Sequence, residues 1–324
     1  MSPELIIGLS ILAVLTVALG LIYVCYYITF KRKHKGPADP YSGLDHPDYK
    51  DYVQGIHAMI DKLLPIPFEW VEIKSHDGLT LKARYYHKVD GAPVLVKVHG
   101  YNGCPQRDFC GGGVEELDKH YNVLLIDQRG HEHSEGHCTT FGIMERHDLV
   151  GWTNYLVERF GNDVKIVIYG ISMGAATVLM ASSMATLPTQ VVGIIADCGY
   201  SSPKEIIIKV ATEDMHLPGK LAFPFIRLGA RIFGGFDLTE TSALEAVKEN
   251  TRPLLIIHGS GDTFVPHYMS EKIFLAAAPS DDKELMIFEG AGHGVSYMSD
   301  RDRYISAMEN FLSRTTGYTP KTNG

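Results

Sequence analysis

The sequence predicts an α/β protein in which a mostly parallel, eight-stranded sheet is covered by helices on both faces and preceded by one transmembrane helix. From about residue 68 to residue 314, short apolar runs alternate with segments of helical periodicity. This alternation is typical of buried parallel strands joined by helical crossovers. The first 30 residues differ because they form one long apolar run. We therefore expect an N-terminal anchor followed by one large domain.

The first predicted element is the anchor. Residues 5–30 carry no charged side chain over 26 positions. As a helix they would span about 39 Å, more than the ~30 Å hydrocarbon core of a bilayer. A cleavable signal peptide fits poorly, since no Lys or Arg precedes the run, and a buried core helix would not need this length. We predict a single-pass anchor and basic flank over 1–35, bound to the bilayer through residues 5–30.

A basic cluster follows the apolar run, namely Lys31, Arg32, Lys33, His34 and Lys35. The positive-inside rule places such a cluster in the cytoplasm, so we expect the large domain to be cytoplasmic. In the opposite orientation the domain would face an oxidising space, where Cys104 and Cys110 are close enough in sequence to suggest a disulfide. In the cytoplasm they are expected to be reduced thiols.

Residues 36–67 are predicted to be a linker and a helix in front of the domain. Three prolines and two glycines lie in 36–48, and apolar residues recur at helical spacing over 49–64, before Pro65 and Pro67 end the pattern. The domain itself is expected to cover 68–314, with 315–324 as a tail.

The strands of the sheet follow in chain order. Residues 68–73 and 79–86 flank a Ser-His-Asp-Gly turn and predict an antiparallel hairpin. The buried runs after it are 94–98, 122–126, 165–169, 191–196, 254–257 and 285–288, and the helical patterns are 144–160, 172–184, 267–278 and 299–313. Right-handed crossovers would bring the carboxyl ends of the buried strands to one edge, where sites gather.

One stretch is too long for a single crossover helix. Residues 199–250 contain several prolines and phenylalanines, and we interpret about 199–250 as an inserted helical cap. A plain helical excursion with packed aromatic side chains is the alternative.

Composition and motifs exclude several classes of protein. Thirty basic and 38 acidic residues give a net charge of −8, whereas a nucleic-acid-binding protein would usually be basic, so no nucleic-acid partner is expected. Five cysteines in 324 residues do not make a disulfide scaffold. Neither a phosphate-binding loop nor a dinucleotide fingerprint is present. We predict no cofactor, and the oligomeric state stays open.

The central motif is Gly170-Ile171-Ser172-Met173-Gly174. It directly follows one predicted strand and precedes a helix of small residues, which is the setting of a nucleophile elbow. The serine of such a turn is strained, and its neighbours must be small. Ser172 at a helix N-terminus also gains from the helix dipole when negative charge develops. The sequence thus predicts Ser172 as a nucleophile, with a helix N-cap as the plainer interpretation.

A serine nucleophile needs a base and an acid. His293 lies between two glycines after the last predicted strand, which fits the chain order serine, acid, histidine. Asp262 follows the preceding strand and is the predicted acid, although Asp197, at the end of an earlier strand, stays a rival. For the oxyanion we predict the backbone N–H groups of Met173, after the nucleophile, and of Tyr101, in the loop after the third strand.

Together these segments resemble the α/β-hydrolase superfamily over about 68–312. The motifs are His99-Gly100-Tyr101, Asp127-Gln128-Arg129-Gly130-His131, the serine motif, Gly261-Asp262-x-x-Val265-Pro266 and Gly292-His293. Within it, the chain looks like bacterial membrane-anchored hydrolases of the Bem46 and serine-aminopeptidase-like (S33) branches. The resemblance implies cleavage of esters or amides through an acyl-enzyme, with no cofactor. One departure is that Glu132 and His133 replace the glycine and its neighbour that relatives carry.

A metal site is the competing interpretation of one segment. His131, His133, His137 and His147, with Cys138 and Asp148, include ligand types that zinc prefers. The segment overlaps a motif that the resemblance explains without a metal, so we predict none.

The sequence thus predicts a membrane-anchored serine hydrolase whose partner is a small acyl-ester or amide substrate. Esters come first, because the anchor and the apolar cap suggest acyl chains. A serine peptidase or amidase would use the same triad, and a non-catalytic, membrane-tethered binding module would keep only the fold.

Overall fold

The computed structural model describes residues 2–32, 36–279 and 282–319. Its centre is one eight-stranded sheet in the order β1-β2-β4-β3-β5-β6-β7-β8. The strands are β1 (Glu69–Lys74), β2 (Thr80–Tyr86), β3 (Val94–Val98), β4 (Asn122–Ile126), β5 (Ile166–Ile171), β6 (Val191–Asp197), β7 (Leu254–Gly259) and β8 (Lys283–Phe288). β2 runs antiparallel to β1 and β4, and every other neighbouring pair is parallel. The predicted fold class is confirmed.

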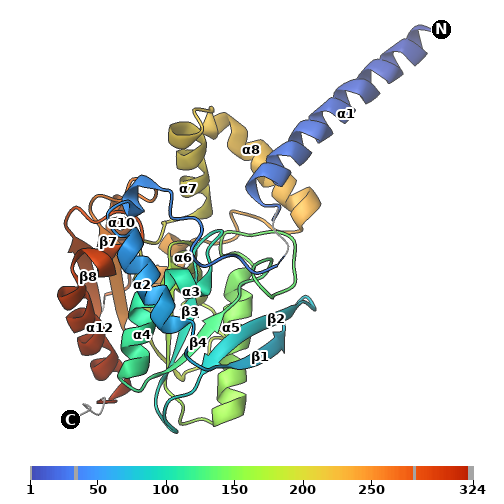
Figure 1. Cartoon of the computed structure of the whole chain (residues 1–324). Coiled ribbons are helices and arrows are strands. Elements are labelled where there is room, and N and C mark those ends of the chain that lie inside the picture. The colour runs from blue at the N-terminus through green and yellow to red at the C-terminus, as the bar shows by residue number, and fades with distance from the viewer. Residues whose placement is uncertain (1, 33–35, 280–281, 320–324) are drawn as a thin grey trace.

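Helices cover both faces of this sheet (Figure 1). In chain order, the α-helices of the described residues are α1 (Pro3–Thr29), α2 (Val53–Leu63), α3 (Pro105–Asp108), α4 (Cys110–Asp118), α5 (Glu145–Phe160), α6 (Met173–Ala181), α7 (Pro203–Lys209), α8 (Gly219–Gly229), α9 (Ala243–Ala246), α10 (Tyr268–Ala276), α11 (Ser296–Ser299) and α12 (Arg301–Thr316). Because side chains alternate along a strand, Val96 and Val98 enter one apolar cluster while Leu95 enters the other.

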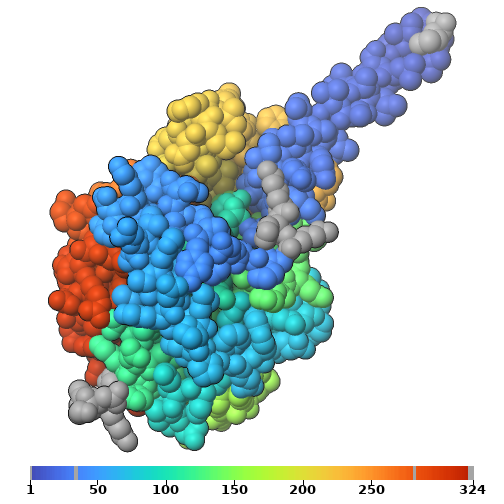
Figure 2. Space-filling model, viewed as in Figure 1, coloured from blue at the N-terminus to red at the C-terminus, as the bar shows by residue number. Residues whose placement is uncertain are grey.

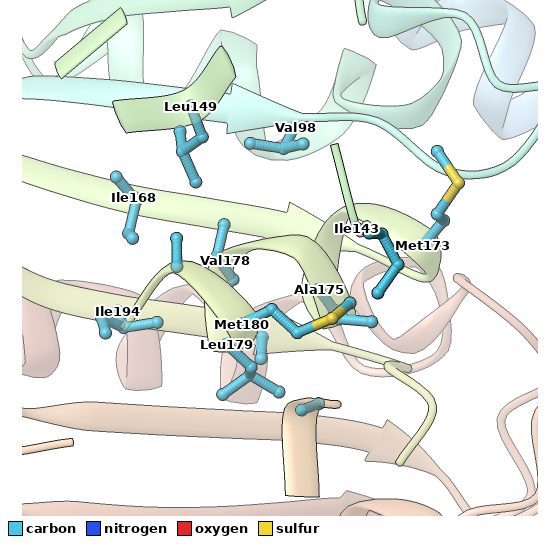
Figure 3. Close-up of a cluster of buried hydrophobic side chains, with 14 of the residues drawn as sticks. Val98, Ile143, Leu149, Ile168, Met173, Ala175, Val178, Leu179, Met180 and Ile194 are labelled. Atoms are coloured by element: carbon cyan, nitrogen blue, oxygen red, sulfur yellow. The ribbon is translucent and has the colours of Figure 1, made fainter. Parts of the chain in front are cut away.

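The helix that follows β5 is buried on all sides. Its small side chains lie between Val98, Ile168 and Ile194 of the sheet and the neighbouring Ile143 and Leu149 (Figure 3). Every residue from Met173 to Ala181 is buried. Since this helix is locked into the core, the residue at its start is held in a fixed position at the carboxyl edge of the sheet.

The N-terminal helix projects away from the body of the molecule (Figure 2). Among the described residues, α1 is the one helix long and apolar enough to cross a membrane, by length and composition. Its base is part of the core, because Tyr26 and Phe30 are buried and the Phe30 ring contacts those of Phe141 and Phe236. The amide of Arg32 donates to the carbonyl of His137, which extends the attachment. Lys33, His34 and Lys35 of the predicted basic flank lie outside the described residues.

The segment predicted as a cap, residues 199–250, folds into α7, α8 and α9 with π-helical turns at Val210–Asp214 and Ala230–Gly234. We call this segment the cap. α7 and α8 rise above the carboxyl edge of the sheet, and α8 crosses the base of α1 (Figure 1). A Cβ on Gly229 would lie 2.9 Å from the carbonyl oxygen of Ile22. The close approach of α8 to α1 therefore depends on this glycine.

Candidate active site

Ser172 occupies a sharp turn between β5 and α6. Its φ of +56° and ψ of −114° are strained for a residue with a side chain. A Cβ on Gly170 would lie 2.1 Å from the backbone of Gly174, and one on Gly174 would lie 1.9 Å from the carbonyl oxygen of Val98. The obstacles are backbone atoms that cannot move aside, so both flanking positions must be glycine. The Gly-x-Ser-x-Gly spacing is thus a steric requirement of this turn.

The imidazole of His293 lies between a hydroxyl and a carboxylate. Its Nε2 is 2.9 Å from Oγ of Ser172, and its Nδ1 is 2.7 Å from Oδ2 of Asp262. Both distances are those of hydrogen bonds. The structure therefore brings together the three predicted side chains, which come from the turns after β5, β7 and β8. All three residues are buried.

Asp262 is held as an anion by several donors. Its Oδ1 accepts hydrogen bonds from the amides of Phe264 (2.9 Å) and Val265 (2.7 Å). Burial opposes ionisation, but the charge of His293 and the hydrogen bonds from His258 and His293 outweigh it and hold the pKa of Asp262 well below its usual value. A carboxylate that stays charged can fix the tautomer of the imidazole and stabilise its protonated form.

The sequence reasoning did not single out His258, which also contacts this carboxylate. Its Nε2 lies 2.8 Å from the carbonyl oxygen of Val265 and 3.1 Å from Oδ2 of Asp262, while its Nδ1 lies 2.6 Å from Oγ of Ser270. Because the carbonyl and the carboxylate can only accept, Nε2 is the donor to both. The i, i+4 spacing of His258 and Asp262 was the available signal. His258 fixes the orientation of the acid.

The environment of His293 favours its protonated form. Burial alone would lower the pKa of the imidazole, but the side chains of Cys198 and Asp262 raise it well above the usual value. Burial raises the pKa of the Cys198 thiol to about 11, so this thiol is uncharged near neutral pH. The charge that acts on His293 is therefore that of Asp262, and the pair behaves as a strong base.

Asp197, the rival acid, has different partners. Its Oδ2 accepts a hydrogen bond of 2.9 Å from the hydroxyl of Tyr304, and among the described residues its Oδ1 has no partner. Burial raises the pKa of Asp197 to about 6. The carboxylate that hydrogen-bonds to His293 is that of Asp262, and the geometry thus favours Asp262 as the acid.

The two amides predicted to bind an oxyanion come from two separate segments, the start of α6 and the loop after β3. Met173 is the first residue of α6, so its amide has no acceptor inside the helix. Tyr101 follows Gly100, where a Cβ would lie 3.3 Å from Cβ of Ser172. A hydrogen bond from the amide of Gly100 to Asp108 (2.9 Å) holds this loop against the nucleophile.

A residue of the predicted linker also supports the site. Oδ2 of Asp48 accepts a hydrogen bond of 2.7 Å from the amide of His293. A Cβ on Gly292 would lie 2.6 Å from Cβ of Asp48, so the loop that carries the histidine rests directly on this side chain. The sequence reasoning missed Asp48, because nothing local indicates a contact so distant along the chain.

Two cavities meet at Ser172. One, of about 310 Å³, has a mixed lining that includes Arg107, Asp108 and His293. The other, of about 270 Å³, is lined almost wholly by apolar side chains of the cap and of α1. Ser172, Tyr101 and Phe264 border both. A substrate with a polar part and an apolar part would therefore place the bond between them at the serine.

The histidine-rich segment does not converge on one point. The ring of His131 contacts that of His99 with ring centres 4.8 Å apart, the ring of His147 contacts that of His76 at the same distance, and the ring of His133 contacts that of Trp70 at 4.6 Å. Asp148 is bound by Arg129 through two hydrogen bonds of 2.6 Å. These side chains have separate partners, which does not favour the metal interpretation of this segment.

A second set of possible metal ligands overlaps the serine site. Ligand atoms of Cys198, Asp262 and His293 all lie within 4.8 Å of one another, and zinc accepts all three types. Both nitrogens of His293 are already engaged, with Ser172 and Asp262, and zinc binds a thiolate rather than a neutral thiol. The observed hydrogen bonds suit proton transfer better than metal binding.

The loop that contains Glu132 and His133, where the sequence differs from the family motif, is held in place by several contacts. Glu132 takes a φ of +48°, the left-handed conformation that a glycine would adopt without strain. Its carboxylate accepts a hydrogen bond of 2.9 Å from the amide of Ala38 and lies 3.7 Å from the guanidinium of Arg84. These contacts hold the loop in shape although the glycine is missing.

Comparisons with known proteins agree with this arrangement. A family model described as alpha/beta hydrolase fold matches residues 93–221, and one described as prolyl oligopeptidase family matches 235–319. The uncharacterized protein YqkD of Bacillus subtilis is 29% identical over 203 residues, 63% of this chain and 66% of that protein. Lysophosphatidylserine lipase ABHD12 of Danio rerio is 26% identical over 277 residues, 82% of this chain and 66% of that protein. Each match spans about two thirds of the relative.

Solved structures show the same fold. The esterase Pf2001 of Pyrococcus furiosus has a TM-score of 0.63 at 23% identity, covering 79% of this chain and 94% of that one. The acylaminoacyl peptidase of Pyrococcus horikoshii has a TM-score of 0.58 at 21% identity, covering 82% of this chain and 45% of that one. The Bem46 or S33 branch stays a prediction. The sheet order, the strained serine turn and the two family models, each of which matches less than half of the chain, together give this chain the α/β-hydrolase fold and identify it as a hydrolase similar to members of that superfamily.

Proposed function

We propose that this chain is a membrane-anchored serine hydrolase that cleaves carboxylic esters through an acyl-enzyme. One observation carries the proposal: His293 lies within hydrogen-bond distance of both Ser172 (2.9 Å) and Asp262 (2.7 Å). A serine hydroxyl is a weak nucleophile until an adjacent base takes its proton, and this arrangement supplies the base and the group that orients it.

The reaction follows from these contacts. Oγ of Ser172 attacks the acyl carbonyl while Nε2 of His293 takes its proton. The Nδ1–H of His293 keeps its hydrogen bond to Asp262, whose negative charge stabilises the imidazolium. His293 then gives the proton to the departing alcohol, and the acyl group stays on Ser172. Water, activated by the same histidine, releases the acid and restores the enzyme.

The negative charge of the tetrahedral intermediate needs donors that are already in position. The amides of Tyr101 and Met173 flank the serine and supply them, aided by the N-terminal end of α6. Losing one such donor typically lowers the rate by about 10²–10³. In this proposal the two backbone amides form the oxyanion hole.

The anchor is the second part of the proposal. α1 carries no charged side chain after Glu4 and projects from the domain (Figure 1), so we place it across the bilayer. Lys31 and Arg32 follow it directly, and the positive-inside rule then puts the domain in the cytoplasm. Protease treatment of sealed, right-side-out membrane preparations tests this orientation, because a cytoplasmic domain stays intact until the membrane is opened.

A peptidase or amidase is the second candidate. The prolyl oligopeptidase family model covers residues 235–319, which include Asp262 and His293, and the same triad can cleave amides. We place esters first because of the apolar cavity beside Ser172. Acyl esters of several chain lengths, assayed beside aminoacyl amides, separate the two.

The test of the chemistry is covalent labelling. A fluorophosphonate should label the wild-type protein at Ser172 and should not label Ser172→Ala, and ester hydrolysis should vanish in that variant. A neighbouring serine with no role in the proposal, Ser182, provides the matched control, Ser182→Ala. Equal labelling of wild type and Ser172→Ala would overturn the proposal in favour of a binding module or another nucleophile.

A further inference from the structure

The apolar cavity beside Ser172 has an unusual wall. Cys25, Ile28 and Thr29, from the last turns of α1, line it together with residues of the cap. The hydroxyl of Tyr101, at the inner end of the cavity, donates a hydrogen bond of 3.2 Å to the carbonyl of Thr29. The helix proposed as the anchor is thus in contact with the substrate cavity and with the loop that holds an oxyanion donor.

The mouth of this cavity lies between α1 and the cap. Three of its lining residues are also exposed on the outside: Ile28 is 53% exposed, and Met215 and Leu217 are each 47% exposed. All three are apolar. Exposing an apolar cavity rim of this kind to water costs free energy, and contact with hydrocarbon removes that cost.

The cap helix α8 and the π-helical turn that follows it carry an exposed apolar stripe. Leu221, Phe225, Leu228 and Ile232 are 71%, 50%, 41% and 51% exposed. Their spacing of four, three and four residues puts them on one helical face, while the opposite face is buried in the core. Lys220, Arg227 and Arg231 lie on the same segment, and the two arginines share an ion pair with Asp237. An apolar face flanked by basic residues is typical of helices that lie in the membrane interface.

The position of α8 along α1 fits such an interface. α8 crosses α1 at Ile22 and Tyr26, as the contacts of Gly229 show. The helix from Leu5 to Ile22 has a length of about 27 Å, close to the ~30 Å of a hydrocarbon core. When α1 spans the bilayer in this way, α8 lies at the membrane surface, and the cavity mouth, to which α1 contributes Cys25, Ile28 and Thr29, opens at the level of the headgroups.

We propose that the last turns of α1 and the cap form an acyl-chain site that opens into the bilayer, so that a membrane-resident acyl ester reaches Ser172 along the helix. This proposal rests on the serine hydrolase function proposed above. The acyl chain occupies the apolar cavity and the ester carbonyl lies at Ser172. The polar alcohol part occupies the second cavity, beside Arg107 and Asp108. The substrate class is an ester of a long acyl chain that resides in the membrane.

The test compares two esters on the full-length protein in phosphatidylcholine vesicles. One is a water-soluble butyrate ester and the other is a palmitate ester of the same alcohol dissolved in the bilayer. Ile28→Trp narrows the mouth from α1, and Ala222→Trp narrows it from the cap. We expect the ratio of palmitate to butyrate hydrolysis to fall about tenfold or more in both, because pocket volume discriminates between acyl chains. Leu19→Trp is the control: Leu19 is 48% exposed, and its spacing of nine residues puts it on the face of α1 opposite Ile28, so this variant should keep the wild-type ratio.

The stripe on α8 is tested separately. The double variant Leu221→Ser, Phe225→Ser should lower palmitate hydrolysis in vesicles about tenfold, because it removes apolar area that would be buried in the interface. Phe160→Ser, a comparably exposed residue at the far end of α5, serves as its control and should have no effect.

The outcomes separate this proposal from the one beneath it. If Ser172→Ala still hydrolyses butyrate, the serine hydrolase function is wrong. If Ser172→Ala is inactive but Ile28→Trp and Ala222→Trp keep the wild-type ratio, the proposed catalytic function stands and the proposed acyl-chain site is overturned. Fluorophosphonate labelling of each variant shows that it is folded, and using two positions on different elements guards against one variant failing to fold.

Discussion

The backbone amide of His293 donates a 2.7 Å hydrogen bond to the carboxylate of Asp48, a residue 245 positions earlier in the chain. The histidine loop thus rests on the segment that links the N-terminal helix to the sheet. This contact lies outside the proposed triad and holds the backbone of the residue proposed as its base.

Replacing Asp48 with alanine should therefore lower kcat with little change in KM. A misplaced base costs rate even when substrate still binds, and we expect a loss of about 10- to 100-fold. Asp48→Asn keeps an oxygen that accepts the amide and should restore most of the rate. Asp45→Ala, an exposed position of the same segment, is the control. Steady-state kinetics on a soluble ester measures all three, and a wild-type kcat for Asp48→Ala would contradict the positioning role.

Changing Asp262 to asparagine should lower kcat far more than changing Asp197 to asparagine. Asp262 hydrogen-bonds to the imidazole, whereas Asp197 binds Tyr304. Asp262→Asn should lower kcat by about 10⁴, as loss of the orienting acid does in comparable triads, and Asp197→Asn by much less. The opposite ranking would show that Asp197 is the acid.

The pH dependence of kcat/KM follows from the raised pKa of His293. The base works only when neutral, so activity should fall as the pH drops through that pKa. The midpoint should lie above about 6.5, the ordinary value for histidine. In Asp262→Asn the stabilising charge is gone, and the midpoint of the residual activity should move to lower pH. An unmoved midpoint would mean that another group controls the profile.

The tight turn at Ser172 predicts that adding a single methyl group at Gly170 strongly lowers the stability of the protein. In Gly170→Ala the new Cβ would meet the backbone of Gly174 at 2.1 Å, which should lower the free energy of unfolding by about 3 kcal/mol or more. Gly112→Ala in α4 meets nothing within 4 Å and should stabilise the helix by up to about 1 kcal/mol. Thermal unfolding in detergent compares the two, and equal stabilities would argue against the turn as described.

The residues at the base of α1 should contribute to the stability of the domain as core residues do. Phe30 is 1% exposed, so Phe30→Ala should lower the free energy of unfolding of the domain by about 3–5 kcal/mol. Val24, half exposed on the same helix, provides the control: Val24→Ala should change it by less than about 0.5 kcal/mol. Unchanged stability of Phe30→Ala would mean that the helix base is only loosely attached.

Most of the fold was predictable because its signals are local. Each buried strand is a short apolar run, and the glycines around Ser172 mark a turn that permits no other residue. The three site residues were predicted because each follows a strand, and parallel strands bring such positions to one edge. The hydrogen bonds then distinguish Asp262 from Asp197, which strand position alone left open.

The residues that sequence reasoning missed depend on contacts between distant segments. Asp48 looks like an ordinary linker residue, and His258 like the end of a strand, until the folded chain places each against the triad. The wall that α1 contributes to the apolar cavity was equally hidden. An apolar run long enough to cross a membrane gives no sign that its last turns pack against a globular domain.

The docked base of α1 also bears on how the protein is prepared. A fragment that starts after residue 32 would lack Tyr26 and Phe30. The rings of these two residues contact those of Phe141, Phe233 and Phe236, which would then be exposed to water. We expect such a fragment to aggregate through the exposed rings, and it would lack the wall that α1 contributes to the apolar cavity. Purification should therefore keep the helix, and a borrowed anchor from another protein would not replace it.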